Sequence, residues 1–101
     1  MLSIYKITKD FPSEERFALG DQLRRCSVSV SSNIAEGFSR QTKKEKAQFM
    51  FMARGSLTEL QNQLLVARDV GYLSKEEFKP IAEQTVIVSK LINGLIKSVR
   101  T

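Results

Sequence analysis

Hydrophobic residues recur along this chain at the spacing of helix faces. The longest series steps by alternating threes and fours, which is the spacing of one side of an α-helix. It comprises Phe78, Ile81, Thr85, Val88, Ile92, Leu95 and Val99. Two further series comprise Met50, Ala53, Leu57, Leu60, Leu64 and Ala67, and then Leu19, Leu23, Cys26 and Val30. The pattern predicts three amphipathic helices. Ile87 and Leu91 widen the stripe of the last one, so we expect more than one neighbour to cover it.

Proline, glycine and capping residues mark the predicted helix boundaries. Pro12 ends a short helix at the N-terminus, because the residue before a proline is driven away from the α region. Gly37 is expected to end the second helix by supplying a left-handed turn. Capping-box sequences at residues 42–45 and 74–77 predict the starts of the third and fourth helices, and Gly71 is expected to end the third.

These elements predict an all-α fold, an antiparallel up-down four-helix bundle with a shortened first helix, in a single domain over residues 1–101. The first helix spans ~14 Å, whereas the third and fourth span ~42 Å and ~36 Å. One corner of the bundle then leaves apolar surface uncovered, and burying that surface would stabilise the fold by about 5 kcal/mol. Self-association is therefore expected. Pro80 falls in the second turn of the last helix, and the regular part of that helix is expected to start near Pro80.

Composition excludes several classes of chemistry. The chain has 101 residues, 16 lysines and arginines, 11 acidic residues, no histidine and one cysteine. Without histidine, catalytic triads, histidine general bases and most metal sites are excluded, so we expect a non-enzymatic protein with no catalytic residues, no metal and no cofactor. Lys6 precedes any apolar stretch of signal-peptide length, and no apolar run approaches the ~20 residues of a membrane span. A cytoplasmic protein without a membrane partner is expected.

Basic residues cluster between Glu36 and Gly55, where a local charge of +3 lies within the net +5 of the chain. Such a cluster binds phosphates nonspecifically or forms an ordinary solvated helix start. In this interpretation aromatic residues do not interleave with the charges, so stacking of nucleobases on aromatic side chains is not expected. The residues assigned to nucleic-acid binding are Arg24, Arg25, Arg40, Lys43, Lys44 and Lys46.

The polar corner formed by Asn33, Glu36 and Gly37 is assigned a structural role, with Arg24 or Arg25 as the counter-charge of Glu36. A further glycine, Gly55, is expected to mark a close helix crossing, because glycine inside a helix costs about 1 kcal/mol relative to alanine.

Other apolar positions lie on or beside the helix faces. Phe51 and Met52 fall off the main stripe, and they form either a wider core face or an exposed contact between subunits. Cys26 lies on the apolar face of the second helix and is expected to be buried and inert.

Three blocks carry a family resemblance: YKITKDFP at residues 5–12, RRCSVSVSSNIAEG at residues 24–37 and ARGSLTEL at residues 53–60. The chain resembles the four-helix bundle proteins encoded by intervening sequences in bacterial 23S ribosomal RNA genes, the S23 ribosomal protein family. This family includes the accessory variability protein of diversity-generating retroelements. Members usually have a longer first helix ahead of the position of Tyr5, and often proline where this chain has Ser31.

The resemblance implies a bundle that commonly assembles into a barrel-like pentamer with a basic surface. The retroelement relative binds nucleic acid and a reverse transcriptase. Two hypotheses therefore stand for this chain. It is a homo-oligomer that binds RNA or DNA, or it is an assembly scaffold or accessory subunit of a larger protein partner such as a reverse transcriptase.

Overall fold

The computed structural model describes residues 4–100, with side chains throughout this range except at residues 15–17. All regular structure in this range is helical. The elements are α1 (Ile4–Thr8), α2 (Ser13–Glu15), the π-helical turn η1 (Arg16–Gly20), α3 (Asp21–Ser39), α4 (Lys43–Asp69) and α5 (Lys75–Arg100).

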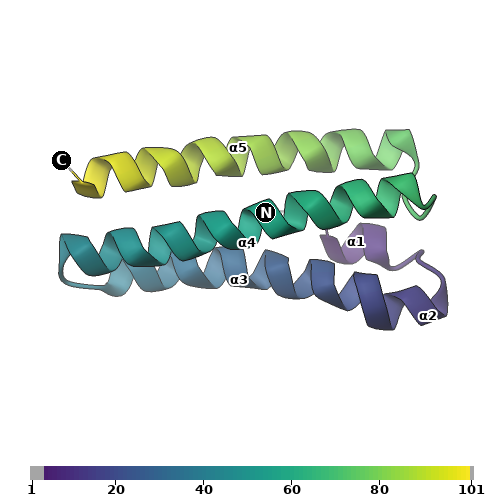
Figure 1. Cartoon of the computed structure of the whole chain (residues 1–101), viewed down its shortest axis with the longest axis horizontal. Coiled ribbons are helices and arrows are strands. Elements are labelled where there is room, and N and C mark those ends of the chain that lie inside the picture. The colour runs from purple at the N-terminus through teal and green to yellow at the C-terminus, as the bar shows by residue number, and fades with distance from the viewer. Residues whose placement is uncertain (1–3, 101) are drawn as a thin grey trace.

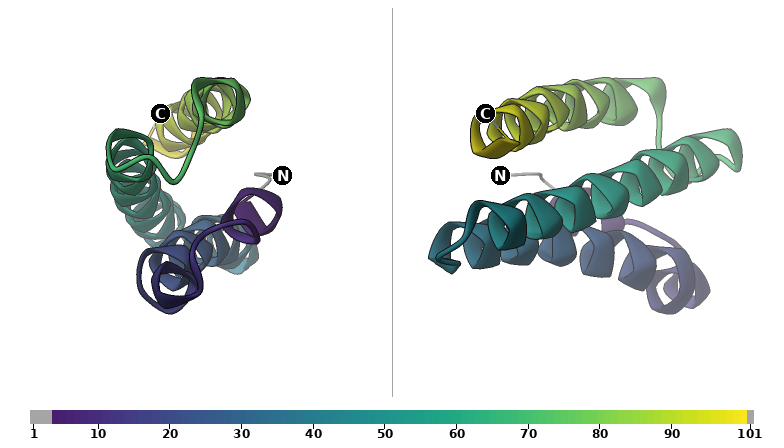
Figure 2. Two further views of the ribbon diagram at one scale, coloured as in Figure 1. Left: turned by 90° about the vertical axis from the view of Figure 1, so that its right-hand side faces the viewer. Right: turned by 60° about the vertical axis from the view of Figure 1, so that its left-hand side comes forward.

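The helices form the predicted antiparallel up-down four-helix bundle, with principal dimensions of 44 × 22 × 17 Å (Figure 1). The second helix of the bundle consists of α2, η1 and α3 in succession. Viewed along the bundle, α3, α4 and α5 occupy three corners and the short α1 occupies the fourth, diagonal to α4 (Figure 2). The main packing contacts run between α3 and α4 and between α4 and α5. The predicted shortened first helix is confirmed.

Capping residues mark the starts of α4 and α5 and the end of α4, as the sequence predicts. The Glu45 amide donates to Thr42 Oγ1 at 3.1 Å before α4. At the start of α5, the Glu77 amide donates to Ser74 Oγ at 3.1 Å and the Ser74 amide donates to Glu77 Oε1 at 3.0 Å, which is a complete capping box. Gly71 follows α4 with φ +88°, the left-handed conformation that glycine adopts without strain.

The expectation that α5 starts near Pro80 is wrong. The helix begins at Lys75 and continues through Pro80. The capping box at residues 74–77 satisfies the first free backbone groups, so the helix is established one turn before the proline.

The core contains most of the predicted apolar series. All six members of the α4 series are buried, and so are Leu23, Cys26 and Val30 of α3. On α5 the buried residues are Ile81, Thr85, Ile92 and Ile96. Apart from Thr85, these residues form one hydrophobic cluster with Ile4, Ile7 and Phe11 from the N-terminal segment. The periodic pattern therefore locates the core correctly on three helices.

Two predictions about buried surface are wrong. Ile87 and Leu91 of α5 are 67% and 54% exposed, because nothing in residues 4–100 covers that side of the helix. Gly55 is exposed, and a Cβ built on it would have no neighbour within 4 Å, so no helix crosses there. The close polar contact between α3 and α4 falls instead on the next residue, where Ser56 Oγ lies 2.8 Å from Ser29 Oγ.

Within residues 4–100, the fourth corner of the bundle is occupied only over the length of α1. On α3, Arg24 contacts α1. Val28 and Phe38 come 4 and 14 residues after Arg24, so they lie on the same face of the helix. On α5, Ile87 and Leu91 likewise continue the face of Gln84, which adjoins α1 residues in a surface depression. All four side chains are exposed. We call these four residues the open corner.

Candidate nucleic-acid interface

Positive charge is concentrated at one end of the bundle. The α3–α4 turn and the last turns of α5 lie together there (Figure 1), so residues 30–55 and 90–100 form this end. They carry eight lysines and arginines and two glutamates, a net charge of +6. The remaining residues carry eight lysines and arginines and nine acidic residues, a net charge of −1. The eight cations, which we call the basic end, are Arg40, Lys43, Lys44, Lys46, Arg54, Lys90, Lys97 and Arg100.

Three members of the basic end, Lys90, Lys97 and Arg100, were missed by sequence reasoning. They lie at least 36 residues beyond Arg54, the last cation of the basic cluster, and α5 returns them to it by running antiparallel to α4. Two contacts fix this alignment: Arg54 Nη1 donates to Asn93 Oδ1 at 3.1 Å, and the Arg100 guanidinium lies over the Phe51 ring. Placing the C-terminal end of the last predicted helix beside the capped start of the third, as an antiparallel pair requires, would have found them.

Two of the predicted phosphate-binding residues at the α3–α4 turn also hold the turn together. Lys46 Nζ donates to the Phe38 carbonyl at 3.1 Å and to the Gly37 carbonyl at 3.5 Å, and so caps the C-terminus of α3. Arg40 Nη2 pairs with Glu36 Oε2 at 3.0 Å. Lys43 and Lys44, in the first turn of α4, are exposed, so they are the cations of this turn most accessible to a ligand.

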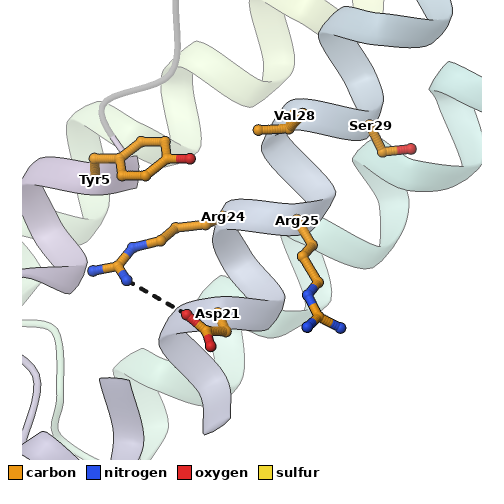
Figure 3. Close-up of a pocket in the computed structure, with 6 residues that line it drawn as sticks. All are labelled: Tyr5, Asp21, Arg24, Arg25, Val28 and Ser29. Atoms are coloured by element: carbon orange, nitrogen blue, oxygen red, sulfur yellow. Dashed lines mark hydrogen bonds and ion pairs between the residues drawn. The ribbon is translucent and has the colours of Figure 1, made fainter. Parts of the chain in front are cut away.

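Arg24 and Arg25 lie away from the basic end, near the junction of α1 and α3 (Figure 3). The Arg24 guanidinium donates through Nε to Thr8 Oγ1 at 3.0 Å and lies over the Tyr5 ring at 5.4 Å. Its Nη1 also pairs with Asp21 at 3.5 Å. Arg24 therefore fastens α1 to α3, whereas the exposed Arg25 leaves the helix in a different direction. The structure does not bring all six predicted residues into one surface.

The polar corner at residues 33–37 is structural, but its contacts differ from those expected. Asn33 Nδ2 donates to the Ser29 carbonyl at 2.9 Å and to Ser29 Oγ at 3.1 Å. The counter-charge of Glu36 is Arg40, one helical turn later, because Arg24 and Arg25 lie at the other end of α3. These two side chains thus bind groups within their own segment of chain.

Gly37 does not supply a left-handed turn. Among residues 4–100, positive φ is confined to Gly71, and α3 continues past Gly37 to Ser39. Gly37 is buried against α4, where a Cβ would lie 2.6 Å from Met50 Cε and 3.4 Å from the Lys46 carbonyl oxygen. Gly37 therefore packs directly against α4, and a side chain there would displace the end of Met50.

Phe51 and Met52 are both exposed, at 38% and 52%. Phe51 lies among arginines, with the guanidinium carbon of Arg54 5.0 Å and that of Arg100 5.6 Å from the ring centroid. Arg40 lies over Phe49 in the same way at 4.7 Å. The expectation that aromatic residues do not interleave with the basic cluster is therefore wrong. Arg54 reaches Phe51 from the next turn of α4, whereas Arg40 reaches Phe49 from the α3–α4 turn and Arg100 reaches Phe51 from α5.

The sequence matches the family model described as 23S rRNA-intervening sequence protein over residues 1–94. The chain belongs to this family. A search of curated proteins finds no match.

A solved structure supports the fold of this 23S rRNA-intervening sequence protein. It is the crystal structure of a protein with unknown function from the S23 ribosomal protein family of Bacteroides thetaiotaomicron. The two superpose with a TM-score of 0.85 at 22% sequence identity, covering 93% of this chain and 88% of the other. At this identity the similarity shows the shared fold.

Between residues 4 and 100, no helix combines the length and apolar character needed to cross a membrane. The same residues contain no cluster of three or more histidine, cysteine or acidic side chains that could hold a metal ion.

Proposed function

We propose that this 23S rRNA-intervening sequence protein is a non-enzymatic, cytoplasmic nucleic-acid-binding protein that contacts phosphates through its basic end. The observation that supports this proposal is the net charge of +6 on one end of a bundle whose remainder carries −1. Lysine and arginine side chains that neutralise phosphates release condensed counterions, which drives binding without sequence specificity. RNA and DNA both present the required phosphate backbone.

The cations fall into groups according to the contacts that each one makes within the fold. Lys43, Lys44 and Lys90 are exposed and are proposed to contact phosphates directly. Arg40 and Lys46 add positive potential while they hold the α3–α4 turn. Arg24 and Arg25 were part of the predicted site, but their distance from the basic end makes them secondary in this proposal.

Self-association through the open corner is the second part of the proposal. Val28, Phe38, Ile87 and Leu91 expose apolar surface on adjoining helix faces, and a second copy that covers them removes this surface from water. The family resemblance implies a pentamer. Assembly of several copies multiplies the basic ends and so steepens the salt dependence of binding.

A second candidate function is an assembly scaffold or accessory subunit for a larger protein, such as a reverse transcriptase. The open corner favours this candidate as well, because exposed apolar patches mark protein interfaces. In that case positive charge accelerates association and contributes little to the bound complex. Charge removal then slows association with the protein partner but leaves the complex intact.

The test is fluorescence anisotropy with labelled RNA and duplex DNA over a series of salt concentrations. We expect log K to fall linearly with log salt, with a slope of about 0.9 per duplex phosphate contacted. The double variant Lys43→Gln with Lys44→Gln should weaken binding at low salt and reduce the slope. Its matched control is Lys75→Gln with Lys79→Gln, which removes two exposed lysines from the opposite end of the bundle.

Nucleic-acid binding is rejected if neither polymer binds at low salt. It is also rejected as a property of the basic end if the control variant weakens binding as much as the Lys43 and Lys44 variant does.

A further inference from the structure

Phe51 sits between two arginines that come from different helices. Arg54 follows it by one turn on α4, and Arg100 reaches it from the last turn of α5, with guanidinium carbons 5.0 Å and 5.6 Å from the ring centroid. Three other rings, those of Tyr5, Phe49 and Phe78, are each contacted by one arginine. Phe51 is 38% exposed, and Arg54 and Arg100 are exposed as well, so the three side chains are accessible to solvent.

The positions of the two arginines are set by the packing of α4 on α5. Arg54 Nη1 donates to Asn93 Oδ1 at 3.1 Å, which orients the guanidinium toward α5 while leaving its remaining donors available. Residues 46–58 and 90–100 contain no acidic residue, so no carboxylate of these segments neutralises the pair. Two like charges held close together on an exposed ring favour an anionic ligand.

The ligand that fits this arrangement has both a flat face and a negative charge. A nucleobase stacks on an aromatic ring or on a guanidinium plane, and the adjoining phosphate accepts charge-assisted hydrogen bonds from arginine. Bases within a duplex already stack on one another and do not offer a free face. A single strand presents unpaired bases and phosphates at every nucleotide.

We propose that Phe51, Arg54 and Arg100 form a stacking site for one unpaired base of single-stranded nucleic acid. A base that takes the place of Arg100 over the ring releases that guanidinium to pair with the neighbouring phosphate, while Arg54 stays anchored to Asn93. This inference rests on the proposed function and adds to it a preference for single strands, which phosphate contacts alone do not produce.

The experiment compares fluorescein-labelled oligouridylate, oligothymidylate and a duplex of equal length by anisotropy at one low salt concentration. Phe51→Leu keeps an apolar side chain and removes the aromatic face. We expect it to weaken binding of the single strands about tenfold and to leave duplex affinity within twofold of the wild type. The matched control is Phe78→Leu, which removes the other α4–α5 arginine-stacked ring, at the opposite end of the bundle, and should change neither affinity.

Circular dichroism and a thermal melt of each variant confirm that it is folded at the assay temperature. As a second readout, ultraviolet crosslinking of a 4-thiouridine oligonucleotide followed by peptide mapping should label the α4 peptide that contains Phe51.

The outcomes separate this inference from the proposed function. If wild-type protein binds single strands and duplex, and Phe51→Leu weakens neither or weakens both equally, the stacking site is wrong and phosphate binding stands. If the wild type binds no nucleic acid, both proposals are wrong. A selective loss with uridylate alone, or with thymidylate alone, supports the site and assigns it to RNA or to DNA.

Discussion

Gly37 of α3 lies so close to Met50 of α4 that a methyl group on the glycine would be 2.6 Å from Met50 Cε. The same methyl group would lie 3.4 Å from the Lys46 carbonyl oxygen and 3.4 Å from Phe49 Cβ. Met50 is 1% exposed, so its terminal methyl group has no solvent to move into. A methyl group at Gly37 would therefore displace the end of the buried Met50 side chain between α3 and α4.

Gly37→Ala should lower the free energy of unfolding by about 1 kcal/mol. Overpacking a filled core costs about 1–3 kcal/mol, and replacing a helical glycine by alanine returns about 1 kcal/mol. Urea denaturation followed by circular dichroism measures the difference. In a Met50→Ala background the added methyl group enters a cavity, so there Gly37→Ala should be stabilising.

Gly55→Ala is the matched control, because this helical glycine faces open space. It should raise the free energy of unfolding by about 1 kcal/mol. Equal stabilisation by both alanine substitutions would show that Gly37 is not in tight contact with α4.

Arg24→Ala should destabilise the fold without weakening nucleic-acid binding. The substitution removes the Nε hydrogen bond to Thr8 Oγ1 and the contact with the Tyr5 ring, both of which hold α1. The loss should be about 1–3 kcal/mol, seen as a lower thermal midpoint. Arg25→Ala, which removes the exposed neighbour, should leave the midpoint nearly unchanged. A normal midpoint together with weakened RNA binding would instead place Arg24 in the interface.

Substituting the open corner should prevent self-association. Ile87→Asp with Leu91→Asp introduces two charges onto the exposed apolar face of α5, and burying either charge in an interface is costly. Sedimentation velocity should show a shift from oligomer toward monomer. Val86→Asp is the control, because Val86 is also exposed but adjoins Leu65 and Phe78 on the α4 side of the helix. A wild-type protein that is monomeric at all concentrations tested would contradict the proposal.

Ser74→Ala should cost about 1 kcal/mol of stability, because the Glu77 amide loses its acceptor at the start of α5. Glu77→Ala should cost a similar amount, since the Ser74 amide loses the other half of the capping box. The double variant should cost less than the sum, as the two hydrogen bonds belong to one motif. Ser32→Ala, at an exposed position inside α3, serves as the control and should have little effect.

The Cys26 thiol should remain protonated in the native state. Burial, and next the neighbouring Glu59 carboxylate, raise its pKa above the ordinary value. Above a pH of about 8.5 the thiol of the unfolded chain ionises while the native thiol stays protonated. Ionisation then favours the unfolded chain, so the stability that Cys26 contributes at neutral pH is lost as pH rises. The stability difference between wild type and Cys26→Ala should therefore shrink between pH 7 and pH 9.5 in urea denaturation. A constant difference would contradict the raised pKa.

The periodic pattern was sufficient to locate the buried faces. Leu57, Leu60 and Leu64 are at most 1% exposed, and their spacing alone assigns them to the core. Periodicity does not reveal which neighbour covers a stripe. Ile87 and Leu91 have the same apolar character, but they are exposed because no helix within residues 4–100 packs over them.

Glycine roles were harder to predict because they depend on the distance to another helix. Gly37 and Gly55 both lie inside helices, yet one is in tight contact and the other faces solvent. The candidate site shows the same limit. Lys43 and Lys44 were found from local charge, whereas Arg100 joins them only through the antiparallel pairing of α4 and α5.

The separation of charge along the bundle also controls how the molecule turns in solution. A body 44 Å long with +6 on one end and −1 on the remainder has an electric dipole moment roughly parallel to its helices. In the field of a polyanion it rotates before contact, so that the α3–α4 turn arrives first. The open corner lies along the flank, at right angles to that approach. In the proposed function, a polyanion and a second subunit would therefore approach along different directions, although Phe38 and Leu91 of the open corner lie within the segments that form the basic end.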